Sequence, residues 1–459
     1  MANFQNNLTE GSVSKNLIKF SLPYLLSNVI QSIYGMADLL IVGIYNGPES
    51  ISGVNLGSQL TQLITMLVLG LVTGGTVMIA QYIGAKREKD MEETIGTLFT
   101  LMCLLAVVFT VILIAFSDNL LNLINTPPES FAEAKSYFTI CSSGLIFIFG
   151  YNAISAVLRG MGDSKNPLKF VTIAAITNVF LDLLFVGPFN MKAGGAAIAT
   201  VIAQALSMII SIIYLIRSRF AFDFKLKSFV IKKEKLKQLL SIGLPTSLQN
   251  SIASISFLTL TSLINAYGVY ASAGVGIVGK INSFAIMPTA AMSASVTAMV
   301  GQNIGAGRYD RAKETMQVGR NIALVIGTTT FLLIQLFPQA FISIFTKDPV
   351  SIAFGIDYAR SFSFDYIIVP FTFCASGLLT GSGNTLFVAF ASILCSLLLR
   401  IPMAQILSGP ADLGIFGIGL AVPIGSLGNY ILSAIYIATG KWKNSKITGS
   451  SEMIDTIEN

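Results

Sequence analysis

Two aspartates, Asp38 and Asp182, lie inside long stretches of apolar residues. An ionised aspartate at the centre of a membrane helix costs roughly 2.5–3.5 kcal/mol on insertion scales, so an acid in such a stretch is a functional candidate. Gln31, Tyr34 and Asp38 are spaced i, i+3 and i+7, and Asn178 precedes Asp182 by four residues. Each set therefore shares one face of its predicted helix.

A third apolar stretch carries Ala196 and Thr200, again spaced i and i+4. A small residue at such a position lets a neighbouring helix or an ion approach closely. Carboxylates, an amide and a hydroxyl from three helices could together enclose Na⁺ or form a carboxyl pair that shares a proton. The alternative is that these side chains only join helices through hydrogen bonds, which contribute about 0.6 kcal/mol each in measured cases.

The elements that position these residues are predicted to be membrane helices. Hydrophobic residues make up 53% of the 459-residue chain and charged residues only 11%, and the mean hydropathy is +0.73. Soluble domains carry about 25% charged residues. Because a bilayer core requires roughly 20 apolar residues per helix, we predict an all-α integral membrane protein of about twelve transmembrane helices. The predicted spans lie near residues 17–44, 53–82, 94–116, 134–158, 167–188, 194–217, 238–265, 273–300, 315–345, 352–380, 385–407 and 414–439.

The basic residues are concentrated in alternate loops between these spans. The net charge is +6, and the segment 217–237 alone contains eight lysines and arginines. By the positive-inside rule the basic side faces the cytoplasm, so both termini of this multi-pass protein of the cytoplasmic membrane are predicted to be cytoplasmic. Because topology and attraction to anionic lipids account for the positive charge, we expect no nucleic-acid partner.

The chain contains no histidine, which excludes histidine triads, imidazole metal sites and histidine proton relays. Its four cysteines lie in apolar stretches, at spacings typical of neither zinc sites nor disulfide frameworks. No nucleophile or metal-ligand motif is present. We therefore expect a protein that is not an enzyme and that uses no cofactor, with Na⁺ or H⁺ as a coupling ion.

The sequence also repeats itself. Residues 80–94 (AQYIGAKREKDMEET) match residues 301–315 (GQNIGAGRYDRAKET) at seven of fifteen positions, and Pro23 falls on Pro245 in nearly the same register. Both copies of this polar motif lie on the basic side, so each repeat contains an even number of helices. We predict two pseudo-symmetric six-helix bundles related by an axis along the membrane normal. The expected N-terminal lobe, cytoplasmic linker, C-terminal lobe and cytoplasmic tail cover residues 1–220, 221–237, 238–440 and 441–459.

Several polar motifs follow one another between and within the predicted spans. QYIGAKR and QNIGAGR come after the second and eighth helices, LRGMGDSKNP after the fourth, and NVFLDLLFVGPFNMKAGGAAIATVIAQ covers the fifth and sixth. In these motifs the chain resembles, over nearly its whole length, the multidrug and toxic compound extrusion (MATE) family of cation-coupled antiporters. The resemblance implies a cation site of Asp38, Asn178, Asp182 and Thr200, which would ligate Na⁺ in a sodium-coupled transporter, with backbone oxygen from Ala196 and a supporting network of Gln31, Tyr34 and Asn152.

The C-terminal half departs from the N-terminal half. In the repeat register Asp38 corresponds to Leu260 and Asp182 to Met403, so the oxygen donors are not duplicated. Charged residues do occur in the later spans and form a second candidate polar site, with snorkelling or structural ion pairing as the alternative. They are Lys280, Asp365 and Arg400.

The resemblance implies a secondary antiporter that exports organic, often cationic or amphipathic compounds, that is, multidrug efflux driven by Na⁺ or H⁺. Pro23 lacks the amide hydrogen of a helix, so it is a candidate hinge, with a static kink as the alternative. The alternative function is a flippase for lipids or lipid-linked oligosaccharides, which would need basic residues to hold phosphate groups. We expect small organic substrates and membrane lipids as partners, and a functional monomer.

Overall fold

The computed structural model describes residues 7–218, 220, 222–444 and 447, and these residues are almost entirely helical. Residue 221 of the predicted linker and most of the predicted tail lie outside the described residues. The elements are α1 (Val13–Tyr45), α2 (Pro48–Gly84), α3 (Glu88–Ala115), α4 (Ser117–Leu123), α5 (Pro128–Ser143), α6 (Leu145–Gly160), α7 (Lys165–Val186), α8 (Lys192–Arg217), η1 (Leu226–Ser228), α9 (Lys233–Asn265), α10 (Val269–Ala285), α11 (Met287–Gly305), α12 (Tyr309–Leu336), α13 (Pro338–Ile342), α14 (Pro349–Phe362), α15 (Asp365–Gly381), α16 (Thr385–Leu394), the π-helical turn η2 (Cys395–Arg400), α17 (Ile401–Ser408), α18 (Gly414–Ala438) and η3 (Lys441–Lys443).

The long helices correspond to the predicted membrane spans. Within the described residues, 9 helices are long and apolar enough to cross a bilayer, and up to 11 if each of two bent pairs is one span. The remaining predicted span, 238–265, lies in α9, whose 33 residues extend about 50 Å at 1.5 Å per residue. Serine, threonine and amide side chains lower the apolar content of α9. The prediction of a multi-pass, all-α membrane protein is confirmed.

Two of the predicted spans are bent. The axes of α5 and α6 differ by 52°, and those of α14 and α15 by 45°. Gly144 lies at the first break, where an added Cβ would come 2.5 Å from Cγ2 of Val201 on α8. A side chain at this position would therefore push α8 away. Hydrophobic periodicity alone predicts one helix over each stretch, because a single glycine does not interrupt an apolar run.

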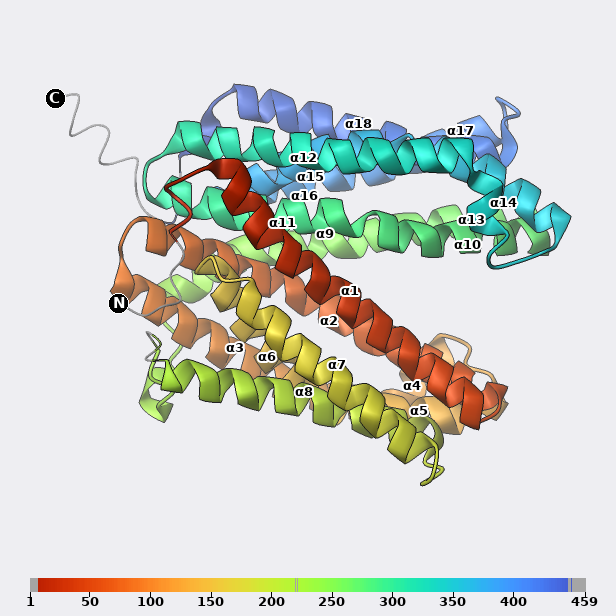
Figure 1. The fold of residues 1–459 in the computed structure, drawn as a ribbon, viewed down its shortest axis with the longest axis horizontal. Coiled ribbons are helices and arrows are strands. Elements are labelled where there is room, and N and C mark those ends of the chain that lie inside the picture. The colour runs from red at the N-terminus through yellow and green to blue at the C-terminus, as the bar shows by residue number, and fades with distance from the viewer. Residues whose placement is uncertain (1–6, 219, 221, 445–446, 448–459) are drawn as a thin grey trace. The chain divides into compact units, whose positions relative to one another are not determined.

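The chain divides into two compact units. The first contains residues 23–79 and 87–240, and the second contains 8–22, 80–86 and the described residues from 241 onward. In the first unit, α7 and α8 lie side by side (Figure 1). Buried apolar residues join these two helices to α1 and α5, and they include Val42, Tyr137, Val186, Ala193 and Ala197.

The second unit is built around four helices, α11, α12, α15 and α18, of which α15 packs against the other three (Figure 1). One of its buried clusters includes Val296, Met299, Leu378 and Trp442. Leu17, from the beginning of α1, belongs to the same cluster. The first turns of α1 are therefore part of the core of the second unit.

The two copies of the repeated motif contact each other within the second unit. An added Cβ at Gly84 would lie 1.9 Å from the carbonyl oxygen of Gln302, and one at Gly305 would lie 1.9 Å from the carbonyl oxygen of Gln81. Neither position has room for a side chain. The duplicated sequence thus forms a reciprocal pair of backbone contacts.

The described part of the linker packs on α3. The Phe99 ring lies 5.5 Å from Phe222, 5.8 Å from Phe224 and 6.3 Å from Phe229, measured between ring centroids. Buried aromatic rings of this kind contribute both apolar area and preferred edge or stacked geometries. This basic segment is therefore held against the first unit by its phenylalanines.

Candidate cation-binding site

Helices α1, α7 and α8 bring four of the predicted site residues together inside the first unit. Asp38, Asn178 and Asp182 expose 4%, 1% and 0% of their surface. The Asn178 amide Nδ2 donates to Thr200 Oγ1 across 3.4 Å, and Thr200 Oγ1 donates to Asp38 Oδ2 across 3.3 Å. One line of hydrogen bonds thus runs from α7 through α8 to α1.

The two carboxyl groups lie within hydrogen-bonding reach of each other. Four buried acceptor oxygens in this cluster have no hydrogen-bond donor: Asp38 Oδ1, Asn178 Oδ1, and both carboxyl oxygens of Asp182. A buried acceptor without a partner costs about 1–3 kcal/mol. Two adjacent carboxylates cannot both remain charged in a low dielectric without a proton or a cation between them.

The donor set suits a small hard ion. Oxygen ligands from carboxylate, amide and hydroxyl groups bind Na⁺-like or Ca²⁺-like cations, whereas soft metals prefer sulfur and imidazole. Across the described part of the chain, no group of three or more histidine, cysteine, aspartate or glutamate side chains could hold a metal. With two carboxyls and two neutral side chains, the cluster can accept a proton or a monovalent cation at low net charge.

The helical spacing seen in the sequence explains this convergence. Asn178 and Asp182 lie one turn apart on α7, and Ala196 and Thr200 lie one turn apart on α8. Ala196 is fully buried, in the apolar cluster that joins α1, α7 and α8. Its single methyl group lets the helices approach closely enough for Thr200 to reach Asp38. A role for its backbone oxygen as a ligand stays a prediction.

The predicted supporting network is arranged differently from the expectation. The amide of Gln204 donates to the Tyr34 hydroxyl across 3.2 Å. The Asn152 amide donates across 2.8 Å to the carbonyl oxygen of Ile148, in its own helix. In the described structure no hydrogen bond joins Gln31 or Asn152 to the two carboxyls. Gln204 was missed in the sequence, although it continues the i, i+4 series of Ala196 and Thr200.

Tyr137 on α5 is a second residue that the sequence did not indicate. It is 5% exposed and packs in the apolar cluster beneath the site. Its hydroxyl lies beside Thr200 and Cys141 and interacts with the charge of Asp38. No spacing pattern in the sequence marks it.

The second candidate polar site is partly assembled in the second unit. Asp365 is 4% exposed and interacts electrostatically with Arg400, which lies in the π-helical turn η2. The Arg400 guanidinium stacks 4.8 Å from the centroid of the Phe257 ring. Lys280 is exposed on α10 and is not among the groups that act on Asp365. In this unit the buried acid therefore has a cationic neighbour.

Pro23 lies inside α1, which continues unbroken from Val13 to Tyr45. Its carbonyl oxygen accepts a hydrogen bond of 2.9 Å from the Ser27 hydroxyl. The boundary between the two compact units falls at this proline, since residues 8–22 group with the second unit and residues 23–79 with the first.

The family of the chain is shown by a match to each of its two repeats. The MatE family model matches residues 23–184 and again residues 245–406. The chain belongs to the MatE family. Residue 23 of the first match corresponds to residue 245 of the second, which is the register that aligns the two prolines. The internal duplication is confirmed.

Relatives cover nearly the whole chain. It is 30% identical over 445 residues to the probable multidrug resistance protein YpnP of Bacillus subtilis, covering 96% of this chain and 98% of that protein. It is 29% identical over 455 residues to the probable multidrug resistance protein NorM of Thermotoga maritima, covering 97% of both chains. A crystal structure of MATE in the straight conformation has the same fold, with a TM-score of 0.90, 24% identity, and 96% and 100% coverage of the two chains.

Proposed function

We propose that the protein is a cation-coupled secondary antiporter that exports organic, often cationic or amphipathic compounds. The observation that carries this proposal is the cluster of four buried oxygens without donors at Asp38, Asn178 and Asp182. Such a cluster gains most when a proton or Na⁺ enters it, as a coupling ion must. The relatives named for multidrug resistance support the proposed class of substrate.

Coupling would act through the charge on α1. When Na⁺ or H⁺ binds at Asp38 and Asp182, the carboxyl charge is neutralised and α1 repacks, with Pro23 as the point where a backbone hydrogen bond is already missing. Substrate then loses its contacts and leaves. Alternating access of this kind requires only that the ion bind one conformation more tightly than the other.

The same proposal includes location and assembly. We expect a monomer in the cytoplasmic membrane, with both termini inside, no enzymatic activity and no cofactor besides the coupling ion. A cysteine at exposed Lys227 should resist an impermeant thiol reagent in intact cells, whereas one at exposed Lys347 should react. Because native Cys103 is exposed, both variants should be made in a Cys103→Ala background. Labelling of the cysteine at 227 from outside would reverse the orientation.

The transport proposal is tested by dye efflux from proteoliposomes under an imposed Na⁺ or pH gradient. Asp38→Asn and Asp182→Asn should each abolish gradient-driven efflux, because each removes a charge while nearly keeping the side-chain shape. Asp412→Asn is a matched control, since Asp412 is exposed on a loop. Unchanged coupling in both site variants would refute the proposed site. Lipid translocation without dye export would favour the flippase.

A further inference from the structure

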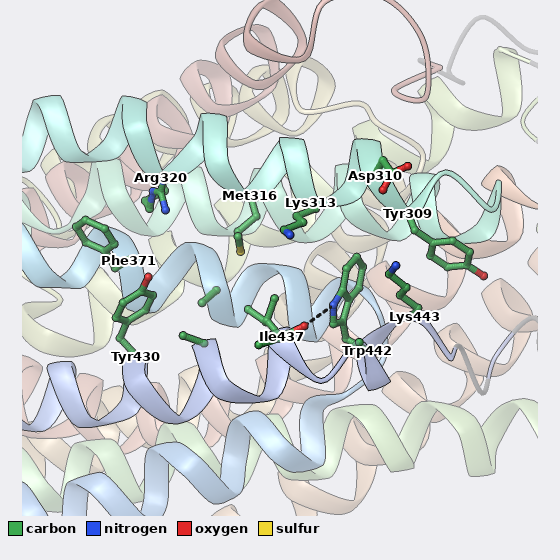
Figure 2. A pocket seen from close by; sticks show the side chains of 14 residues that line it. Tyr309, Asp310, Lys313, Met316, Arg320, Phe371, Tyr430, Ile437, Trp442 and Lys443 are labelled. Atoms are coloured by element: carbon green, nitrogen blue, oxygen red, sulfur yellow. Dashed lines mark hydrogen bonds between the residues drawn. The ribbon is translucent and has the colours of Figure 1, made fainter.

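A groove of about 370 Å³ lies within the second unit, between α12, α15, α18 and η3 (Figure 2). Lys313, Met316 and Arg320 form one of its walls, and their spacing of i, i+3 and i+7 places them on one face of α12. Trp442 of η3 also lines the groove. The proposed cation site belongs to the first unit, so neither that site nor its chemistry accounts for this groove.

The groove carries an excess of positive charge. Its described lining residues include three basic side chains and one acidic side chain, Asp310. The basic ones are Lys313, Arg320 and Lys443. None of these three basic side chains forms a salt bridge with the carboxylates that the structure describes. The Arg320 guanidinium lies 5.3 Å from the centroid of the Phe371 ring. The charge is therefore available to an anion.

Part of the groove wall is apolar. Small residues, Ala375 and Ala434, leave the space open, and Met316 and Ile437 provide apolar surface. Beside it, α18 exposes Ile435, which is 60% accessible although large and hydrophobic. Exposed apolar side chains on a membrane helix suit contact with lipid tails, so we infer that the groove lies next to lipid. A soluble anion would leave this apolar wall unused.

The basic end of the groove has the residues of a membrane interface. The Trp442 indole donates to the carbonyl oxygen of Ile437 across 3.1 Å, and its ring centroid lies 6.5 Å from that of Tyr309. Trp and Tyr concentrate where headgroups meet the hydrocarbon core. Arg320 lies seven residues beyond Lys313, about 10 Å deeper along α12.

We propose that this groove binds one anionic phospholipid from the leaflet on the basic side of the membrane. Its phosphate contacts Lys313 on α12 and Lys443 in η3, which both line the groove (Figure 2), and an acyl chain follows Met316 toward Phe371. Basic pockets between membrane helices hold anionic headgroups in this way. The proposal concerns a bound lipid rather than a transported one, and it does not depend on the cation site.

Trp442 provides the test, because it is the only tryptophan in the chain. The purified full-length protein in phosphatidylcholine nanodiscs is titrated with phosphatidylglycerol that carries brominated acyl chains, which quench tryptophan at short range. Brominated phosphatidylcholine at the same mole fraction is the reference. We expect half-maximal quenching by the anionic lipid at a mole fraction at least tenfold lower. Equal quenching by the two lipids would overturn the proposal.

Variants separate charge from shape. Lys313→Gln combined with Lys443→Gln should weaken the anionic preference at least tenfold, since each basic residue near a membrane surface is worth about fivefold. Lys441→Gln is the matched control, because Lys441 lies in η3 but does not line the groove. Ala434→Leu fills the groove without changing its charge and should also abolish the preference. The site would be refuted if the double lysine variant were quenched by the anionic lipid at the same mole fraction as the wild type. It would also be refuted if millimolar inorganic phosphate displaced the lipid, because the groove would then be a site for soluble anions.

Discussion

The hydroxyl of Thr200 on α8 lies 3.3 Å from Asp38 Oδ2 on α1 and donates a hydrogen bond to it. This single contact joins the helix that carries the first buried acid to the helix with the small residue Ala196. Because Asn178 in turn donates to Thr200, the hydroxyl is the central member of the cluster. The position of Asp38 should therefore depend on this one oxygen.

Thr200→Val keeps the shape of the side chain but removes the hydroxyl. We expect the affinity for the coupling cation to fall about tenfold or more, since a hydrogen bond to a charged group contributes about 1.5–3 kcal/mol. Thr200→Ser keeps the hydroxyl and should stay within a factor of a few of the wild type. The cation concentration that gives half-maximal efflux is the measurement. Equal values for the Val and Ser variants would show that the hydroxyl takes no part.

The buried acid of the second unit should behave differently from Asp38. Asp365→Asn removes the carboxylate that interacts with the charge of Arg400, so we expect a lower melting temperature, because a buried charge loses compensation. Cation coupling should persist. Asp365→Asn combined with Arg400→Gln should recover part of the melting temperature. If Asp365→Asn stopped coupled transport at unchanged stability, the coupling site would lie in the second unit.

If substrate and cation compete, their binding must be linked. A substrate that favours the cation-free conformation weakens cation binding by the same factor by which the cation weakens substrate binding, typically 5–150-fold. Isothermal titration of Na⁺, and proton uptake measured at fixed pH, should both show weaker binding when a transported dye saturates the protein. Identical cation affinities with and without dye would rule out competition, even if Asp38 proved essential.

The reciprocal contacts of the repeated motif predict a stability effect far from the polar cluster. In Gly84→Ala and in Gly305→Ala, the new Cβ would meet a backbone oxygen at 1.9 Å, so the two motifs must separate. Overpacking of this kind costs about 1–3 kcal/mol. Gly276→Ala is the control, because nothing lies within 4 Å of the Cβ position there. The melting temperatures of the detergent-solubilised proteins compare the three variants.

The linker makes a contact that depends on pH. The Ser228 hydroxyl donates to the Asp223 carboxylate across 2.5 Å and, with the backbone amide of Lys225, holds the pKa of that carboxyl below its usual range. A carboxyl with a lowered pKa stabilises the fold above its ordinary pKa of about 4 and loses this contribution as the pH falls through the lowered value. The contact should therefore be constant between about pH 5 and 7. Ser228→Ala should speed amide hydrogen exchange over 222–230 at neutral pH, corrected for intrinsic rates, while Ser14→Ala should not.

Much of the polar cluster could be predicted because helical spacing is a local property of the sequence. Asn178 and Asp182, four residues apart in an apolar run, can only point the same way. Gln204 could have been found by extending the same spacing one more turn. Tyr137 could not, because its approach to Thr200 depends on how α5 packs against α8, which no pattern within α5 encodes.

The fold shows the same division between local and distant information. The repeat follows from motif register, and the two family matches bear it out. Apolar length predicts about twelve spans, and 9 to 11 of them meet the length and apolarity criteria within the described residues. The bend at Gly144 and the π-helical turn that carries Arg400 depend on contacts with distant helices, such as the close approach of Val201. Hydrophobic periodicity predicts that both stretches are helical but does not predict the bend or the π-helical turn.

The beginning of α1 has a consequence for how the two repeats became one protein. Four apolar residues that precede the linker are nevertheless buried in the core of the second unit. They are Leu8, Val13, Leu17 and Phe20. The duplicated halves have therefore exchanged a segment, much as domain-swapped subunits do. A chain that ends at the linker would contain the beginning of α1 without the core in which it is buried. The C-terminal half alone would lack this segment, so part of its apolar core would be uncovered. We therefore expect neither repeat to be stable when it is expressed without the other.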